Sequence, residues 1–214
     1  MRKQEKKKFK VAEIVSEHIK KNKKEYTIVS LVFLIGIVIG IIFINNINIE
    51  QRSDIQEYLV NFTQSLNQDY QIDLNNLLKN SIINNLILVL VLWIIGSTVI
   101  GMPILYMIIC IKGFSLGYTI SSIMITYPFW KGIIFTVSTL LLQNIIIIPC
   151  IIALAVSGIK IYKSIIKDKR KNNIKVEILK HTIFSSAIAV FLIIASFIES
   201  YVSTNLLMFC VNLY

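Results

Sequence analysis

The residues most suggestive of catalysis are Gly113-Phe114-Ser115-Leu116-Gly117, which match the GxSxG pattern of serine hydrolases. That motif requires a strand-to-helix turn in an α/β sheet, which exposes the serine. An intramembrane serine protease would instead pair a buried serine with a histidine, and the only histidines are His18 and His181. Close helix packing explains both glycines without catalysis, so the pattern does not predict a serine hydrolase.

Other catalytic and metal-binding signatures are missing from the sequence. It contains no HExxH motif, no pair of intramembrane carboxylates and no glycine loop for phosphate or dinucleotide. Cys110, Cys150 and Cys210 form no CxxC motif and have no neighbouring histidine. The sequence therefore predicts no enzyme, no cofactor and no metal site.

Amide side chains interrupt the apolar part of the chain at two places. Asn84 and Asn85 open one apolar segment, and Gln143 and Asn144 lie within a later one, shortly before Pro149. An amide in hydrocarbon needs a hydrogen-bond partner, so these side chains should face other helices or a polar cavity. Pro149 favours a kink, because it leaves a carbonyl of the preceding turn without its donor. The amides could join helices, or they could line a transport path or a partner-binding groove.

The composition indicates the elements that must position these residues. The 214-residue chain is 55% hydrophobic, with a mean hydropathy of +0.70. The stretch 82–159 contains no acidic residue and only two basic ones, which is typical of a polytopic membrane protein. The net charge of +10 comes from basic residues beside apolar segments. That pattern favours anionic lipids as partners and argues against nucleic acid.

The number of spans follows from the distribution of charge. Residues 1–26 hold ten of the 22 basic residues and 160–180 hold eight, so both should be cytoplasmic, whereas the acidic loop 45–80 should lie outside. An odd number of crossings must separate residue 80 from residue 160, and three fit the length. Spans are expected near 27–44, 83–107, 113–129, 132–158 and 182–198. The predicted fold is an all-α bundle of five membrane helices with a cytoplasmic N-terminus and an extracytoplasmic C-terminus.

The segments outside the spans also have expected roles. Residues 1–26 should form a basic segment with a helix on the membrane surface, before a single membrane domain at 27–214. The loop 45–80 should be helical, with Asp73 capping a helix that runs into the second span. Lys112 should mark a cytoplasmic turn. The further cytoplasmic anchors expected in the loop 160–180 are Lys169, Arg170 and Lys171.

Small residues recur at intervals of four on two predicted spans. Gly36 and Gly40 form GxxxG in the first span, and Gly113, Gly117 and Ser121 continue the spacing in the third. Such rows let helices approach closely where no hydrophobic force drives them together. They predict helix-packing surfaces, either within the bundle or between copies in a homo-oligomer.

Several of these residues occur together in the order seen in one known family. The segments concerned are Lys112-Gly113-Phe114 with Gly117, Leu142-Gln143-Asn144 with Pro149, and Glu199-Ser200-Tyr201-Val202. With the basic start and the outer loop, they resemble the stage II sporulation protein M family over nearly the whole chain. The sequence has Ser203-Thr204 where the family pattern has Thr-Pro, and Leu142 where it has Pro. These departures concern local helix geometry.

The resemblance implies a multi-pass protein of the mother-cell membrane at the sporulation septum and engulfing membrane. It further implies a non-enzymatic scaffold for engulfment and septal peptidoglycan thinning. Its partners would be the peptidoglycan-degrading stage II sporulation proteins D and P. Glu199, Ser200 and Tyr201 are the candidate partner-binding residues. The alternative is a transporter or channel component with a polar path near Gln143 and Asn144.

Overall fold

The computed structural model describes residues 19–67, 73–98, 100–167 and 171–207, and these ranges contain helices and short turns but no strand. The α-helices are α2 (Lys23–Asn45), α3 (Ile49–Asn67), α4 (Leu74–Gly96), α5 (Gly101–Thr126), α6 (Phe129–Thr136), α7 (Leu142–Lys167) and α8 (Lys171–Phe197). Two π-helical segments, η1 (Val137–Leu141) and η2 (Ile198–Ser203), adjoin α7 and α8. The predicted all-α class is confirmed.

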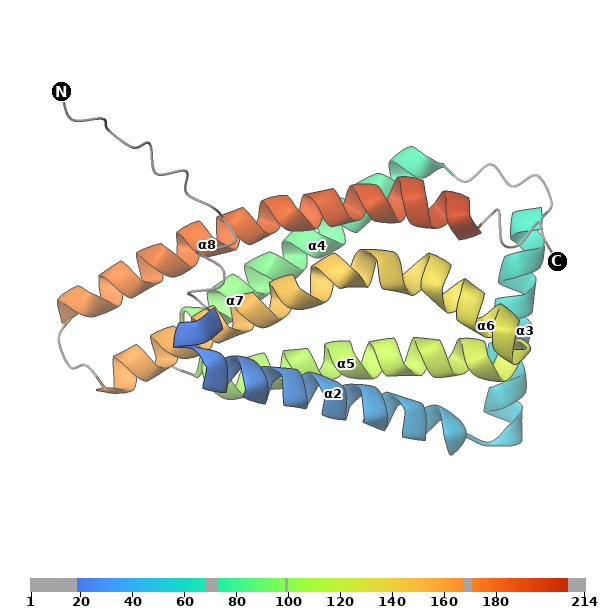
Figure 1. The fold of residues 1–214 in the computed structure, drawn as a ribbon, viewed down its shortest axis with the longest axis horizontal. Helices are drawn as coiled ribbons and strands as arrows, with labels where there is room; N and C mark the ends of the chain where they lie inside the picture. Colours follow the sequence, from blue (N-terminus) through green and yellow to red (C-terminus); the bar gives the residue numbers. More distant parts are fainter. Residues whose placement is uncertain (1–18, 68–72, 99, 168–170, 208–214) are drawn as a thin grey trace, which may run out of the picture.

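Five helices within the described ranges are long and apolar enough to cross a membrane. They cover Lys23–Asn45, Leu74–Gly96, Gly101–Thr126, Leu142–Ile166 and Lys175–Leu207. The predicted number of spans is therefore confirmed. Successive spans run in alternating directions, and α3 lies across the end where α2 stops and α4 begins (Figure 1). We call this the α3 end; that it faces outward stays a prediction.

The connection between the second and third spans differs from the prediction. A turn was expected at Lys112, but α5 runs without a break from Gly101 to Thr126 and carries Lys112 near its middle. The chain turns between α4 and α5 instead, where the N–H of Ser97 donates to the carbonyl of Trp93 and the N–H of Gly101 donates to that of Thr98. The second span consequently ends, and the third begins, about ten residues earlier than expected, because a lone lysine was taken as a boundary.

The start of α4 agrees with the sequence. The carboxylate of Asp73 accepts hydrogen bonds from the backbone N–H groups of Asn75 and Asn76, at 3.0 and 3.1 Å. These bonds satisfy donors that a helix N-terminus leaves unpaired. The predicted cap is therefore confirmed, and α4 continues from it directly into the second span.

The basic segment 160–180 is largely helical and not the loop that was expected. α7 extends to Lys167 and α8 begins at Lys171, so both helices extend beyond the spans that were expected at 132–158 and 182–198. Lys163 Nζ lies 2.6 Å from Glu25 Oε1, and Glu177 contacts Lys160 and Lys180 at 3.3 and 3.1 Å. These pairs lie at the end of the bundle opposite α3.

Three sets of predicted features fall partly or wholly outside the described residues. The surface helix in 1–26 lies almost entirely within 1–18, and Lys169 and Arg170 lie within 168–170. The end of the C-terminal tail lies within 208–214. Lys171 is described only as the first residue of α8.

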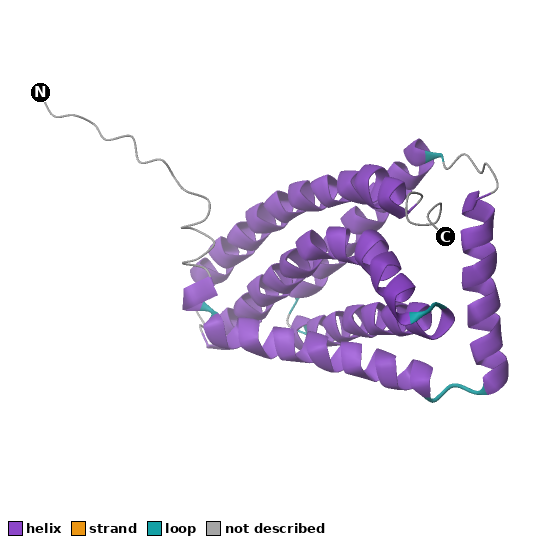
Figure 2. Ribbon diagram, turned by 45° about the vertical axis from the view of Figure 1, so that its right-hand side comes forward, coloured by secondary structure: helices purple, strands orange, loops and turns teal. Residues whose placement is uncertain are grey.

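The closest contact in the bundle joins α2 and α5, which lie side by side in both views (Figures 1 and 2). A Cβ atom added at Gly36 or Gly40 would lie 2.2 or 2.3 Å from a carbonyl oxygen of α5. One added at Gly113 or Gly117 would lie 2.2 Å from a carbonyl oxygen of α2. Only glycine fits these four positions. Ser121 is buried on the same helix, so the row predicted on α5 is used for packing.

This contact bears on the predicted homo-oligomer. Gly36 and Gly40 are buried against α5 of the same chain, and Gly113 and Gly117 are buried against α2. The two glycine rows therefore pack against each other, and neither is accessible to a second copy of the chain. An oligomer would need a different surface of the bundle.

The fourth span is the most irregular. α6, η1 and α7 follow one another without a loop and form an arch in Figure 1. Pro149 lies inside α7, where it removes one backbone donor, and η1 adds a wide turn before it. Proline and π segments are the usual causes of such bends.

Candidate functional site

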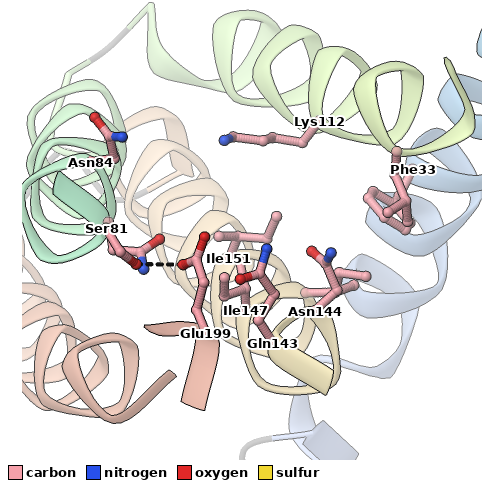
Figure 3. Close-up of a pocket in the computed structure, with 12 residues that line it drawn as sticks. Phe33, Ser81, Asn84, Lys112, Gln143, Asn144, Ile147, Ile151 and Glu199 are labelled. Carbon is pink, nitrogen blue, oxygen red and sulfur yellow. Dashed lines mark hydrogen bonds between the residues drawn. The ribbon is translucent and has the colours of Figure 1, made fainter. Parts of the chain in front are cut away.

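A polar cavity lies inside the bundle, between helices that are apolar over most of their length. Its volume is about 190 Å³, and it is bordered by α4, α5, α7 and η2, with Phe33 of α2 at one side. Seven of its lining residues are polar or charged: Ser81, Asn84, Asn85, Lys112, Gln143, Asn144 and Glu199 (Figure 3). The structure thus brings all four predicted amides together with two charged residues. These are Lys112, which was expected at a turn, and Glu199, which was expected to contact a partner.

The π segments position two of these residues. Glu199 is the second residue of η2, and Gln143 follows η1 by two residues. A π turn takes one residue more than an α turn and commonly occurs at functional sites. η1 and η2 lie against each other in the bundle. Their two wide turns therefore bring a carboxylate and an amide from distant parts of the chain to one cavity wall.

Glu199 is held by neutral donors from two other helices. Ser81 Oγ of α4 donates to Glu199 Oε2. The side-chain nitrogen of Gln143, turned toward the carboxylate, lies 3.0 Å from both of its oxygens. A carboxylate inside a membrane needs such partners, because apolar surroundings supply none. Glu199 therefore joins α4 and α7 to the end of α8.

Two of the amides are engaged in bonds that join or stabilise helices. Asn85 Nδ2 donates to Ser196 Oγ at 2.8 Å, and Ser196 Oγ in turn donates to the carbonyl of Leu192. Asn144 Nδ2 donates to the carbonyl of Leu140 at 2.8 Å, within its own helical segment. The structural interpretation of the amides therefore holds for Asn85, which ties α4 to α8.

Lys112 and Asn84 differ from the other polar residues of the cavity. Both are exposed, and neither forms a hydrogen bond or ion pair with any residue that the structure describes. Lys112 extends from α5 toward α4, where Asn84 lies (Figure 3). A lysine at the centre of a membrane span costs about 3 kcal/mol on insertion. Lys112 is thus a lysine within a membrane span that has no direct ion pair among the described residues.

The two residues considered for serine chemistry do not meet. Ser115 is exposed on α5, whereas His181 is buried at 1% exposure and its Nδ1 lies 2.9 Å from Ser157 Oγ. A substrate cannot reach a histidine so enclosed. The described residues also contain no group of three His, Cys, Asp or Glu side chains that could hold a metal ion.

The predicted partner-binding residues Glu199, Ser200 and Tyr201 point in different directions. Glu199 faces the cavity, and Ser200 has no exposed surface in the single chain, so it stays a prediction that these residues contact a partner. Tyr201 is 40% exposed and stacks on Phe197, with ring centroids 6.2 Å apart. The cause is η2, which continues the helix of α8 where the sequence suggested an open end.

A second arrangement at the α3 end was not predicted. Gln56 Nε2 of α3 donates to the carbonyl of Ile125 at 2.7 Å. Tyr127 Oη donates to the carbonyl of Leu59 at 2.9 Å and lies 3.0 Å from Thr63 Oγ1. These bonds fasten α3 to the turn between α5 and α6. In the sequence, this turn is marked by the aromatic residue Tyr127 directly before Pro128.

The region compared with known proteins includes both arrangements. A family model described as stage II sporulation protein M matches residues 29–204, which include all but the ends of the five spans and every residue that lines the cavity. No curated protein and no solved structure matches the chain. Since the family model covers most of the sequence, the chain belongs to the stage II sporulation protein M family.

Proposed function

We propose that this multi-pass protein is a non-enzymatic scaffold for engulfment during endospore formation. It would recruit the peptidoglycan-degrading stage II sporulation proteins D and P to the mother-cell side of the septum and engulfing membrane, where the septal wall is thinned. The observation that carries the proposal is membership of a sporulation family over residues 29–204. The described residues contain no group of three potential metal ligands, which is compatible with a scaffold.

The α3 end supports this proposal with a fixed polar surface. α3 is bonded to the rest of the bundle at Gln56, Leu59 and Thr63, so its other face is held in place. That face exposes Asp54, Glu57 and Tyr58, the last at 71%. An exposed aromatic side chain on a rigid support is typical of surfaces that bind other proteins, and charged neighbours at the rim can steer a partner of opposite charge.

The basic end of the bundle supports membrane attachment by charge. Lys160 and Lys163 extend α7 beyond its apolar part, and Lys175 and Lys180 lie at the start of the last span. Ion pairs with Glu25 and Glu177 leave an excess of positive charge there. We include anionic lipids among the partners for this reason.

The experiment is affinity capture of the tagged full chain from membranes of sporulating cells. The expected result is that proteins D and P are both recovered, and that the charge reversal Asp54→Lys with Glu57→Lys lowers recovery about tenfold. Lys79→Glu is the matched control, because it reverses an exposed charge on α4 and leaves α3 unchanged. Recovery of neither protein with the unaltered chain would contradict the scaffold.

The cavity favours one other function, a transporter or channel component. A second cavity of about 280 Å³ is lined in part by α3 and shares Gln143 and Glu199 with the first, so these two side chains border both spaces. Five spans without an inverted repeat argue against a self-contained secondary transporter. Flux of a defined solute into vesicles containing only the purified chain, abolished by Gln143→Leu, would favour this function over the scaffold.

A further inference from the structure

Lys112 provides a charge at a depth that few ligands can reach. It is the twelfth of the 26 residues of α5, so it lies about 17 Å along the helix from one end and about 21 Å from the other. An extended lysine side chain is shorter than either distance. Lipid phosphates at the membrane interface are therefore beyond direct reach, and a partner that pairs directly with Lys112 would lie within the apolar layer.

The cavity is open on the side where Lys112 and Asn84 lie. Both side chains are exposed, and several large apolar residues within five positions of them on α4 and α5 are exposed as well. These are Ile83, Ile87, Met107 and Ile111, exposed at 43, 54, 62 and 55%. The opening consequently combines a membrane-facing apolar surface with one cation and one amide at its centre.

Glu199, the carboxylate of the same cavity, forms no direct ion pair with Lys112. Glu199 forms its described contacts with Ser81 and Gln143, and no ion pair joins it to Lys112. A second copy of the chain cannot supply the missing charge either. The stretch 82–159 contains no acidic residue, and the described acidic residues other than Glu199 lie on α3 or near the ends of spans.

We infer that the opening between α4 and α5 is a docking site for a transmembrane helix of another protein, one that carries a carboxylate or amide at mid-membrane. Its apolar side chains would lie against Ile83, Ile87 and Ile111, and its polar group would enter the cavity and contact Lys112 and Asn84. Charge complementarity at that depth selects this occupant, because a wholly apolar helix leaves the ammonium without a partner. The inference rests on the proposed scaffold, whose partners it would hold by their membrane anchors.

The probe is a synthetic transmembrane peptide of leucine and alanine with one central aspartate, and its match has leucine at that position. Energy transfer from the labelled full chain is measured in phosphatidylcholine vesicles, which carry no net lipid charge. The aspartate peptide should bind about tenfold more tightly than the leucine peptide. Lys112→Met should remove this preference, Lys112→Arg should retain it, and the control Lys79→Met should leave it unchanged.

Reversing both charges distinguishes a loss of binding from a variant that misfolds. Lys112→Glu should lose the aspartate peptide and instead prefer a peptide with a central lysine. Equal binding of the aspartate and leucine peptides to the unaltered chain would overturn the inference, as would a preference that persists in Lys112→Met. If the chain still captures proteins D and P, that result leaves the scaffold standing. If the peptide preference holds but neither protein is captured, the scaffold fails and the site serves another membrane protein.

Discussion

Consecutive residues of α5 belong to two opposite kinds of helix contact. Gly113 lies against the backbone of α2, where even a methyl group would overlap a carbonyl oxygen, whereas Lys112 extends into the polar cavity. At Gly113 the first contact brings backbone against backbone, whereas the second is lined by seven polar or charged side chains. The bundle therefore separates close packing from polar chemistry along a single helix.

The difference shows how the polar residues can be tolerated. Helices in lipid gain little from burying apolar surface, so association depends on close contact and internal hydrogen bonds. The four-glycine contact between α2 and α5 supplies the close contact. With α5 fixed by one face, α4, α7 and η2 need not pack tightly against the other. We therefore expect substitutions in the glycine contact to lower stability most, and substitutions in the cavity to affect function more than stability.

The largest effect is expected at the glycines. A Cβ at Gly117 would lie 2.2 Å from the carbonyl oxygen of Ile37 and 2.9 Å from two further backbone atoms of that residue. Because backbone must move, Gly117→Ala should lower the free energy of unfolding by about 2–3 kcal/mol. Reversible unfolding in mixed micelles measures this loss.

Gly132→Ala is the control for that substitution. Its Cβ would meet the Sδ atom of Met124 at 3.1 Å, and the end of a flexible side chain can move aside. Stability should stay the same or rise slightly, since alanine favours the helix. If both alanine variants were equally stable, the glycine contact would not be what fixes α5.

A smaller loss of stability is expected at Glu199. Glu199→Ala leaves Ser81 Oγ and the amide of Gln143 without their acceptor, which should cost about 1–2 kcal/mol in unfolding free energy. Glu199→Gln keeps an acceptor and should cost less. Unfolding in the same micelles and engulfment in cells are both measured. If Glu199→Ala were as destabilising as Gly117→Ala, the cavity would be part of the structural core, and the contrast between the two faces would fail.

The sequence predicted correctly those features that depend only on hydropathy, charge distribution and residue size. Hydropathy and charge parity gave five alternating spans, because each span must be apolar and basic segments favour one side. The spacing of Gly36, Gly40, Gly113 and Gly117 predicted close packing. Which row faces which could not be predicted, since each pattern would fit any neighbouring helix equally well.

The errors came from treating charge only as a sign of the membrane boundary. Lys112 was taken as a turn, although the sequence around Ser97 and Thr98, between Gly96 and Gly101, carries the small and polar residues of a real turn. Glu199 was assigned to a helix end for the same reason. Neither π segment has a sequence signature that would place Glu199 beside Gln143. From the sequence, only the four amides could be recognised as polar residues within the membrane. The two charged residues of the cavity, Lys112 and Glu199, were not assigned to it.

The smallest effect tests whether the amides beside the cavity serve structure or function. Asn85 Nδ2 and Ser196 Oγ form a buried bond of 2.8 Å, whereas Asn84 on the same helix is exposed at the opening. A double-mutant cycle with Asn85→Leu and Ser196→Ala should give a coupling of about 0.6 kcal/mol in unfolding free energy. Asn84→Leu should leave stability unchanged but impair engulfment. A loss of stability in Asn84→Leu equal to that in Asn85→Leu would mean that both amides join helices, and the contrast would then rest on Lys112 alone.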